Sequence, residues 1–247
     1  MEDFWGLAIW LMVTLNSAFC GYKMEPPPEH KALSAGAAPE YAQRRQREGE
    51  KKMNQTGKNV ALKCQFEFSP EKLTVHYTVT NQSGSDIYVL DAFPAVDQTS
   101  RTGYADLKGV YVGEGQGGSA RLLKGIPPLP TGRTVTVRII PLGTKLAPGA
   151  KLERKFELEL PLREQSLYYG QLKSEEYSVI KVNKVRLTVQ FMPSKAEDFQ
   201  ADPAPYAPGF FIVRSKHTVG DAASLDCETE VKDLTLLKRK DLFSRIS

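Results

Sequence analysis

A run of glycines near the middle of the chain is the first feature that suggests chemistry. Residues 113–118 read Gly-Glu-Gly-Gln-Gly-Gly and follow an apolar segment, as phosphate-binding loops do. Such a loop must open a helix, because the N-terminal amides of that helix hold the phosphate groups. Here only residues 119–124 separate the glycines from Gly125 and Pro127. The pattern therefore indicates a hairpin loop, and we expect no nucleotide or other cofactor.

The three histidines are candidates for metal or acid–base chemistry. His30, His76 and His217 lie far apart, and none has a second His or a Cys at the spacing of a zinc site. His76 falls on the polar face of an alternating segment, and His217 follows basic residues in an expected loop. We therefore predict surface positions for both, with no metal site and no catalytic residue. A hydrolase that uses His76 or His217 with a loop carboxylate is the enzymatic alternative.

The cysteines offer redox chemistry. Cys64 occupies an inward position of an alternating segment, where apolar surroundings make a thiol unreactive. Cys64 and Cys227 are the pair that remains if Cys20 is removed with a leader peptide. Two interpretations stay open. The pair forms a disulfide between the first strand and the C-terminal segment in an oxidising compartment, or it is two small buried apolar side chains.

Aromatic residues gather in two segments. Tyr206, Phe210 and Phe211 lie in a proline-rich stretch, and Tyr168 and Tyr169 lie in another expected loop. Exposed together, these rings would form a contact patch for a protein or a glycan. The alternative is that they cap the open end of a sheet structure or cover an edge strand.

The elements that would position these residues show a side-chain period of two. Val60, Leu62, Cys64, Phe66 and Phe68 alternate with mostly polar residues, which is typical of a half-buried strand. Similar patterns, separated by turn sequences, predict strands at residues 73–80, 87–90, 107–112, 120–124, 134–140, 155–160 and 185–191. Since no helical spacing of apolar residues interrupts them, we predict an all-β, antiparallel, immunoglobulin-like sandwich of about seven to nine strands. A closed barrel is the structural alternative.

Two stretches carry a resemblance to a known class of domain. The sequence Leu73-Thr-Val-His-Tyr-Thr-Val-Thr-Asn81, followed by Ile87-Tyr-Val-Leu90, resembles strands of bacterial immunoglobulin-like domains. The turn Leu146-Ala-Pro-Gly149 before the alternating residues 156–160 is similar to turns in such domains. The resemblance covers residues 60–192. It implies a fold and no functional residues.

The N-terminal region differs from the rest of the chain. Residues 4–19 are strongly apolar but shorter than the ~20 residues of a membrane span, and close to the core of a signal peptide. Three interpretations compete: a cleaved signal, a retained anchor, and a start codon upstream of a true start at Met24 or Met53. We expect export to the periplasm or cell envelope, with a cytoplasmic location as the alternative.

A polar stretch follows the apolar segment. Residues 21–58 contain three consecutive prolines and a charged run, a composition typical of a disordered linker. The predicted organisation is a leader or anchor at 1–20, a linker at 21–58, a sandwich at 59–195, and a Pro- and aromatic-rich extension at 196–247. The extension is expected to add one or two strands that pack on the sandwich.

These features favour a non-enzymatic protein with a binding or structural role in the cell envelope. Sandwich domains present end loops and strand edges, which suit a protein or glycan partner. The net charge of +4 is small and lacks the basic stripe of a nucleic-acid binder, so nucleic acid is excluded as a partner. Contact with a membrane is expected only through the N-terminal segment. A cytosolic interaction protein that starts at Met24 or Met53 is the further alternative.

Overall fold

The computed structural model describes residues 55–57, 59–130, 135–168, 173 and 176–240. The expectations for the leader, most of the linker, Cys20, His30 and Tyr169 lie outside these residues. The described part contains fourteen strands and no α-helix. The strands are β1 (Gln55–Gly57), β2 (Val60–Phe68), β3 (Lys72–Asn81), β4 (Ile87–Val96), β5 (Gly103–Asp106), β6 (Tyr111–Glu114), β7 (Ser119–Lys124), β8 (Leu142–Leu146), β9 (Lys151–Glu159), β10 (Leu162–Arg163), β11 (Tyr177–Pro193), β12 (Gln200–Pro203), β13 (Phe211–Arg214) and β14 (Ala223–Arg239).

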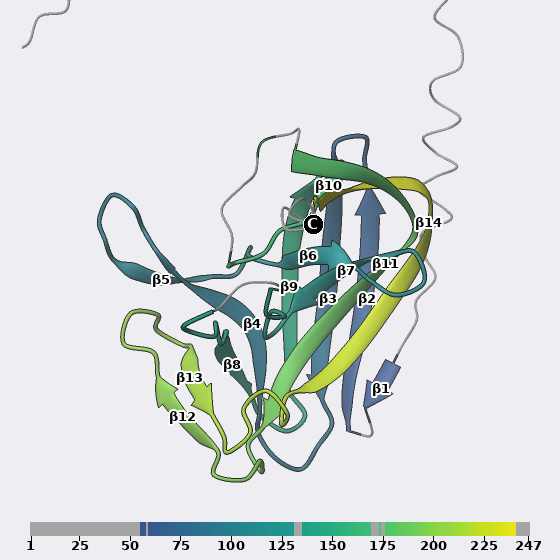
Figure 1. Cartoon of the computed structure of the whole chain (residues 1–247). Coiled ribbons are helices and arrows are strands. Elements are labelled where there is room, and N and C mark those ends of the chain that lie inside the picture. Colours follow the sequence, from purple (N-terminus) through teal and green to yellow (C-terminus); the bar gives the residue numbers. More distant parts are fainter. Residues whose placement is uncertain (1–54, 58, 131–134, 169–172, 174–175, 241–247) are drawn as a thin grey trace, which may run out of the picture. The chain divides into compact units, whose positions relative to one another are not determined.

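The strands form two sheets, which confirms the predicted all-β sandwich (Figure 1). Sheet A has the order β1-β2-β3-β9, and all of its pairs are antiparallel. Sheet B has the order β10-β14-β11-β4-β8-β13-β12, and β7 pairs with β11 as well. Two pairs in sheet B, β7 with β11 and β10 with β14, are parallel. The remaining pairs of sheet B are antiparallel, as expected.

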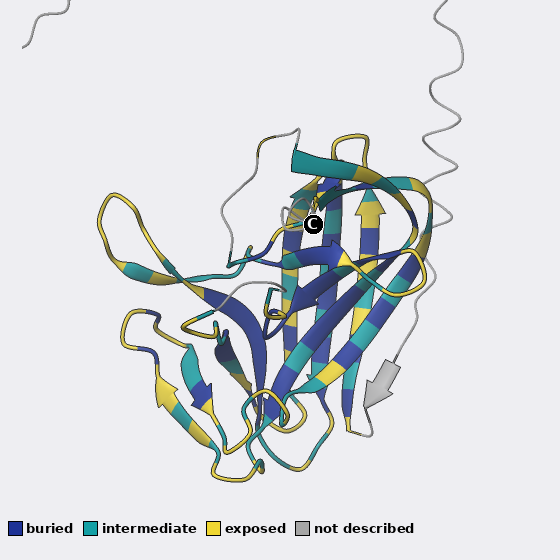
Figure 2. Ribbon diagram, viewed as in Figure 1, coloured by how far each residue is buried: buried dark blue, intermediate teal, exposed yellow. Residues whose placement is uncertain are grey.

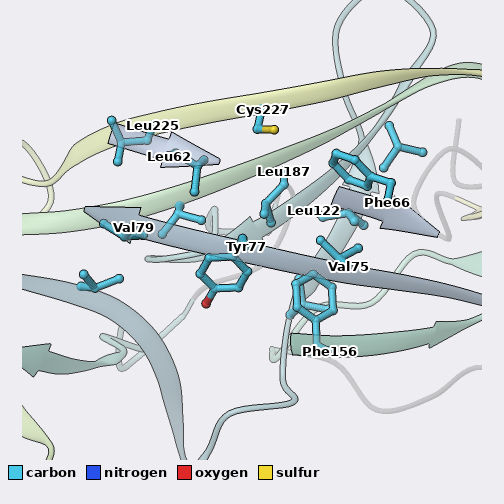
Figure 3. Close-up of a cluster of buried hydrophobic side chains, with 14 of the residues drawn as sticks. Leu62, Phe66, Val75, Tyr77, Val79, Leu122, Phe156, Leu187, Leu225 and Cys227 are labelled. Carbon is cyan, nitrogen blue, oxygen red and sulfur yellow. The ribbon is translucent and has the colours of Figure 1, made fainter. Parts of the chain in front are cut away.

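The core lies between the sheets. Along β3, buried side chains alternate strictly with partly exposed ones, so one face of the strand points inward (Figure 2). Val75 and Phe156 of sheet A and Leu122 and Leu187 of sheet B belong to one cluster of buried side chains (Figure 3). Each fully buried aliphatic or aromatic side chain contributes about 2 kcal/mol to folding. This shared apolar layer is therefore what holds the two sheets together.

Several predicted strands are confirmed, and others are corrected. β2 coincides with the predicted first strand, and residues 115–118 of the glycine run form the turn of the β6–β7 hairpin. The strand expected at residues 134–140 is wrong over its described part, 135–140, where the backbone joins no sheet. The strand expected at 107–112 begins only at Tyr111. The strands outnumber the seven to nine expected because several of them are four residues or shorter.

The C-terminal part of the chain contributes a long strand to sheet B. β14 pairs with β11 from Ala223 to Arg239, with one irregularity near Val182. The segment from residue 232, for which strand and helix were both open, continues this strand as far as Arg239. Sheet B therefore takes strands from both sides of the predicted domain limit at residue 195.

Candidate functional site

Strand β4 leaves the ladder of sheet B after Ala92 and continues as a two-stranded ribbon with β5. We call this ribbon, residues 93–106, the arm. Its register pairs Phe93 with Asp106 and Val96 with Gly103. In the described part of the chain, residues 93–96 pair with no strand other than β5. Figure 1 shows the arm extending away from the rest of sheet B.

Lys124 clamps the base of the arm. Its side chain points from β7 into the space between the sheets and is only 1% exposed. The Nζ group donates hydrogen bonds to the carbonyl oxygens of Leu107 and Gly109, each at 2.6 Å, and of Asp91 at 3.4 Å. Asp91 precedes the arm and Leu107 follows it. One ammonium group therefore ties the two ends of the arm together.

The environment of Lys124 decides what chemistry it can perform. Burial lowers the pKa of its amine to about 8, although the nearby carboxylates of Asp91 and Asp106 oppose this shift. An amine with such a pKa could act as a base or nucleophile near neutral pH. Here, however, the three N–H groups of the ammonium form are engaged by three carbonyl oxygens. The arrangement fits a structural tie better than a reactive amine.

A second polar contact fixes the start of the arm. Asp91 is fully buried and sits where the register between β4 and β8 shifts, as in a β-bulge. Its carboxylate accepts hydrogen bonds of 2.6 Å from Arg154 Nε and from the hydroxyl of Thr144. Arg154 Nη2 also donates to the Thr144 oxygen at 3.3 Å. The buried charge of Asp91 is thus paired and hydrogen-bonded, as a buried carboxylate requires.

Tyr77 lies beside this cluster. Its ring packs edge-on against Phe156, with 6.3 Å between the ring centroids (Figure 3). Its hydroxyl oxygen is buried and has no hydrogen-bond partner among the described residues. Burial, followed by the charge of Asp91, raises the pKa of this phenol well above its usual value. Tyr77 is therefore a neutral group at physiological pH and cannot supply a phenolate.

The tip of the arm is held by its own polar groups. The Asp97 carboxylate accepts hydrogen bonds from the backbone N–H groups of Thr99 and Ser100 and from the Ser100 hydroxyl. These bonds, with that of the Ser100 amide the strongest, lower the pKa of Asp97. The Ser100 and Thr102 hydroxyl oxygens are 2.6 Å apart. The tip therefore has a defined turn conformation, in which the side chains of Asp97, Ser100 and Thr102 form local hydrogen bonds.

Apolar side chains remain exposed on the arm and beside it. Val96 is 61% exposed, Tyr104 46% and Tyr206 38%. A Cβ atom on Gly103 would lie only 2.9 Å from Tyr206 Cγ, so the Tyr206 ring rests directly on the Gly103 backbone. Val96 is the cross-strand partner of Gly103, and cross-strand partners point to the same face of a ribbon. Val96 and Tyr206 therefore share one face of the arm, which we call the arm face.

The aromatic residues singled out in the sequence have different environments. Phe211 packs edge-on against Tyr88, with 5.4 Å between the ring centroids. Phe210 is partly buried against a cluster that includes Ala204 and Ala207. The Tyr168 hydroxyl accepts a hydrogen bond from the backbone N–H of Ile139. Of these rings, Tyr206 is the one that the structure brings to the arm face.

The two histidines that the structure describes, His76 and His217, lie on separate parts of the surface. His76 lies on the outer face of sheet A, with Nε2 3.9 Å from the Glu67 carboxylate. His217 lies in an exposed turn, where its backbone N–H donates to Asp221. In the described residues, neither imidazole is hydrogen-bonded to a hydroxyl, which the hydrolase alternative requires. Across that same part of the chain, no three His, Cys, Asp or Glu side chains gather as a metal site would need.

The comparisons with known proteins add no family. The chain matches no protein-family model, no curated protein and no solved structure. Within the described residues, no helix has the length and hydropathy to cross a membrane. The candidate site therefore rests on its own geometry.

Sequence reasoning missed the residues that build the base of the arm. Lys124 ends a predicted strand, but a lysine at such a position is expected in solvent. Asp91 follows a predicted strand and reads as its end. The partners of Asp91, Thr144 and Arg154, lie more than fifty residues further along the chain. No local signal in the sequence connects these residues.

Proposed function

We propose that the β sandwich is a non-enzymatic, immunoglobulin-like binding module that engages another protein through the arm face. The observation that carries this proposal is the exposure of Val96 beside Tyr206 on a ribbon that extends from sheet B. Tyrosine and apolar side chains of this kind supply most of the free energy of association at protein interfaces.

The clamp at the base of the arm supports this function. Binding costs free energy when it orders a mobile segment, and a segment that is ordered beforehand avoids part of that cost. Lys124 holds both ends of the arm, and the Asp97 turn orders its tip. The arm therefore presents Val96 in a fixed position before a partner arrives.

The chemistry of the arm favours a protein over a glycan. Glycan sites combine an aromatic ring with free polar side chains that bond to sugar hydroxyls. At the tip, the Asp97 and Ser100 side chains bond to one another and to the backbone. The other polar side chains of the tip lie beyond the paired strands that carry Val96 and Gly103. What remains on the arm face is apolar. An apolar surface on the partner, such as another β domain or an extended peptide, complements it.

We place this module outside the cytoplasm, in the periplasm or cell envelope. The apolar residues 4–19 and the polar residues 21–58 support an exported or anchored domain behind a spacer. N-terminal sequencing of the mature protein, combined with cell fractionation, tests the location. A cytosolic protein that starts at Met24 or Met53 would contradict export. It would not affect the proposal that the arm face binds a protein, which has a separate test.

Site-specific photo-cross-linking tests the arm proposal. A photoreactive phenylalanine analogue replaces Val96 in the full chain, in cells that naturally contain the protein. The matched control carries the same analogue at Val179, which is 66% exposed on β11, outside the arm. We expect one discrete protein adduct from position 96 and none from position 179. Equal adducts from both positions, or none from position 96, would contradict the proposal.

A further inference from the structure

The sandwich is joined differently at its two margins. At one margin, the Arg154–Asp91 ion pair connects β9 of sheet A with β4 of sheet B. At the other margin, Cα atoms of β2 and β14 come within 8 Å of each other. This spacing is closer than the ~10 Å that separates sheets packed face to face. In the described chain, β2 and β14 share no backbone pairing, so side chains must make the connection.

Cys64 and Cys227 meet at this second margin. Cys64 occupies an inward position of β2 between Leu62 and Phe66, and Cys227 is buried on β14. Neither sulfur takes part in a disulfide, and a side-chain hydrogen bond connects the Cys64 thiol to the Cys227 sulfur. Figure 3 shows Cys227 among the core side chains between the sheets. Two hydrogen-bonded thiols, on strands whose Cα atoms come within 8 Å of each other, are placed where a disulfide between the strands could form.

We propose that Cys64 and Cys227 are a disulfide site that links sheet A to sheet B. The oxidant is a disulfide, either a small molecule such as oxidised glutathione or a protein with an oxidised cysteine pair. One cysteine thiolate attacks the oxidant and forms a mixed disulfide, which releases one thiol. The second cysteine then attacks the first, the Cys64–Cys227 bond forms, and a second thiol leaves. The two protons that the cysteines lose are taken up, through solvent, by the two released thiols, so the oxidant gains two electrons and two protons.

The surroundings of the two sulfurs set the order of these steps. Burial raises the pKa of the Cys64 thiol, whereas the hydrogen bond from Cys64 lowers the pKa of Cys227. Cys227 is therefore the better thiolate, but it is only 2% exposed. The first attack requires the margin between β2 and β14 to open, so it is slow in the folded protein. The second attack joins two cysteines that are neighbours in the folded protein, so we expect that the mixed disulfide does not accumulate.

The disulfide would close a long loop, because more than 160 residues separate the two cysteines. Closing a loop of this length removes much conformational entropy from the unfolded chain, and this stabilises the folded protein relative to the unfolded one. The inference about the bond does not depend on the arm or on a partner. Its use in the cell does depend on the proposed export, since oxidising compartments are where structural disulfides persist.

The test uses the full chain with the substitution Cys20→Ser, which leaves two thiols. The reduced protein is incubated in a buffer of oxidised and reduced glutathione and sampled over hours. We expect both thiols to disappear, the mass to fall by two hydrogen atoms, and a peptide that contains Cys64 to be joined to one that contains Cys227. We expect the melting temperature to rise by about 10 °C.

Three results would overturn the proposal: thiols that persist at equilibrium, a stable glutathione adduct on either cysteine, or a melting temperature that falls on oxidation. The matched controls are Cys64→Ser and Cys227→Ser, each in the Cys20→Ser background. Neither can form the bond, so neither should gain thermal stability in the oxidising buffer. A gain in either control as large as that of the parent would also overturn it. If a serine variant fails to fold, the comparison of reduced and oxidised parent still decides.

Discussion

Arg154 Nε lies 2.6 Å from the carboxylate of Asp91, and this contact joins the edge strand of sheet A to strand β4 of sheet B. Asp91 is fully buried, whereas the Arg154 side chain remains partly exposed. The pair stands two residues before the arm begins. Asp91 and Arg154 therefore have two roles. They hold the two sheets together at this margin, and they fix the point from which the arm extends.

Loss of Arg154 should be costly. The substitution Arg154→Met leaves a buried carboxylate without its counter-charge, which we expect to lower the free energy of unfolding by about 3 kcal/mol. Urea denaturation measures the change. The double variant Asp91→Asn/Arg154→Met removes both charges and should recover part of the loss. A loss below 1 kcal/mol in the single variant would show that the pair does not matter to the fold.

Lys124 should control the order of the arm. The substitution Lys124→Met keeps the length of the side chain but leaves three carbonyl oxygens without their donor. We expect a loss of about 3 kcal/mol, together with faster amide hydrogen exchange in residues 93–106 than in β2. The control is Lys145→Met, which removes an exposed ion pair with Asp86 and should cost less than 0.5 kcal/mol. Unchanged exchange in the arm would contradict the clamp.

The lowered pKa of Lys124 should make the free energy of unfolding depend on pH. The pKa of Lys124 is about 8 in the folded protein, against a usual value of 10.5. Between these values the unfolded chain binds more protons than the folded one, so stability must rise with pH. The wild type should therefore gain up to about 3 kcal/mol relative to Lys124→Met between pH 8 and 10.5. Urea denaturation across this range measures the difference. A flat or falling difference would mean that Lys124 keeps its ordinary pKa.

The position of the Tyr206 ring should depend on the absence of a side chain at Gly103. In Gly103→Ala the new Cβ would lie 2.9 Å from Tyr206 Cγ, near the backbone end of that side chain, so the ring must move. We expect a loss of about 1 kcal/mol and a change in the NMR signals of Tyr206. The matched control is Gly84→Ala, where no atom lies within 4 Å of the new Cβ. Equal effects of the two substitutions would contradict the packing of Tyr206 on the arm.

The sequence predicted the strands that bury one face along their whole length. In β2 and β3 the alternation is unbroken, and both strands lie where the pattern indicated. The pattern failed at residues 135–140, where valines alternate with polar residues but Val137 is 74% exposed. Alternation alone cannot provide a neighbouring strand to pair with. The true strand, β8, contains Gly143, whose missing side chain admits Val213 and Tyr88, and its sequence does not alternate.

Of the residues that form the candidate site, only Tyr206 was identified from the sequence. Tyr206 was noted as an aromatic residue in a proline-rich segment, and the structure places it on Gly103. The arm itself was missed because Asp91 and Pro94 both read as the end of a strand. Asp91 is tolerated inside the structure because Arg154 neutralises it. Pro94 is tolerated because, in the described chain, β4 has a neighbouring strand on only one side at this point, and proline is accepted in such edge strands.

Affinity for the cross-linked protein is the most direct test of binding through the arm face. Titration calorimetry with the purified partner would compare Val96→Asp with Val179→Asp, which introduces the same charge at an exposed valine outside the arm. We expect Val96→Asp to weaken binding at least tenfold, while Val179→Asp leaves the Kd unchanged and both variants keep the wild-type melting temperature. Equal affinities for both variants and the wild type would show that the partner binds elsewhere.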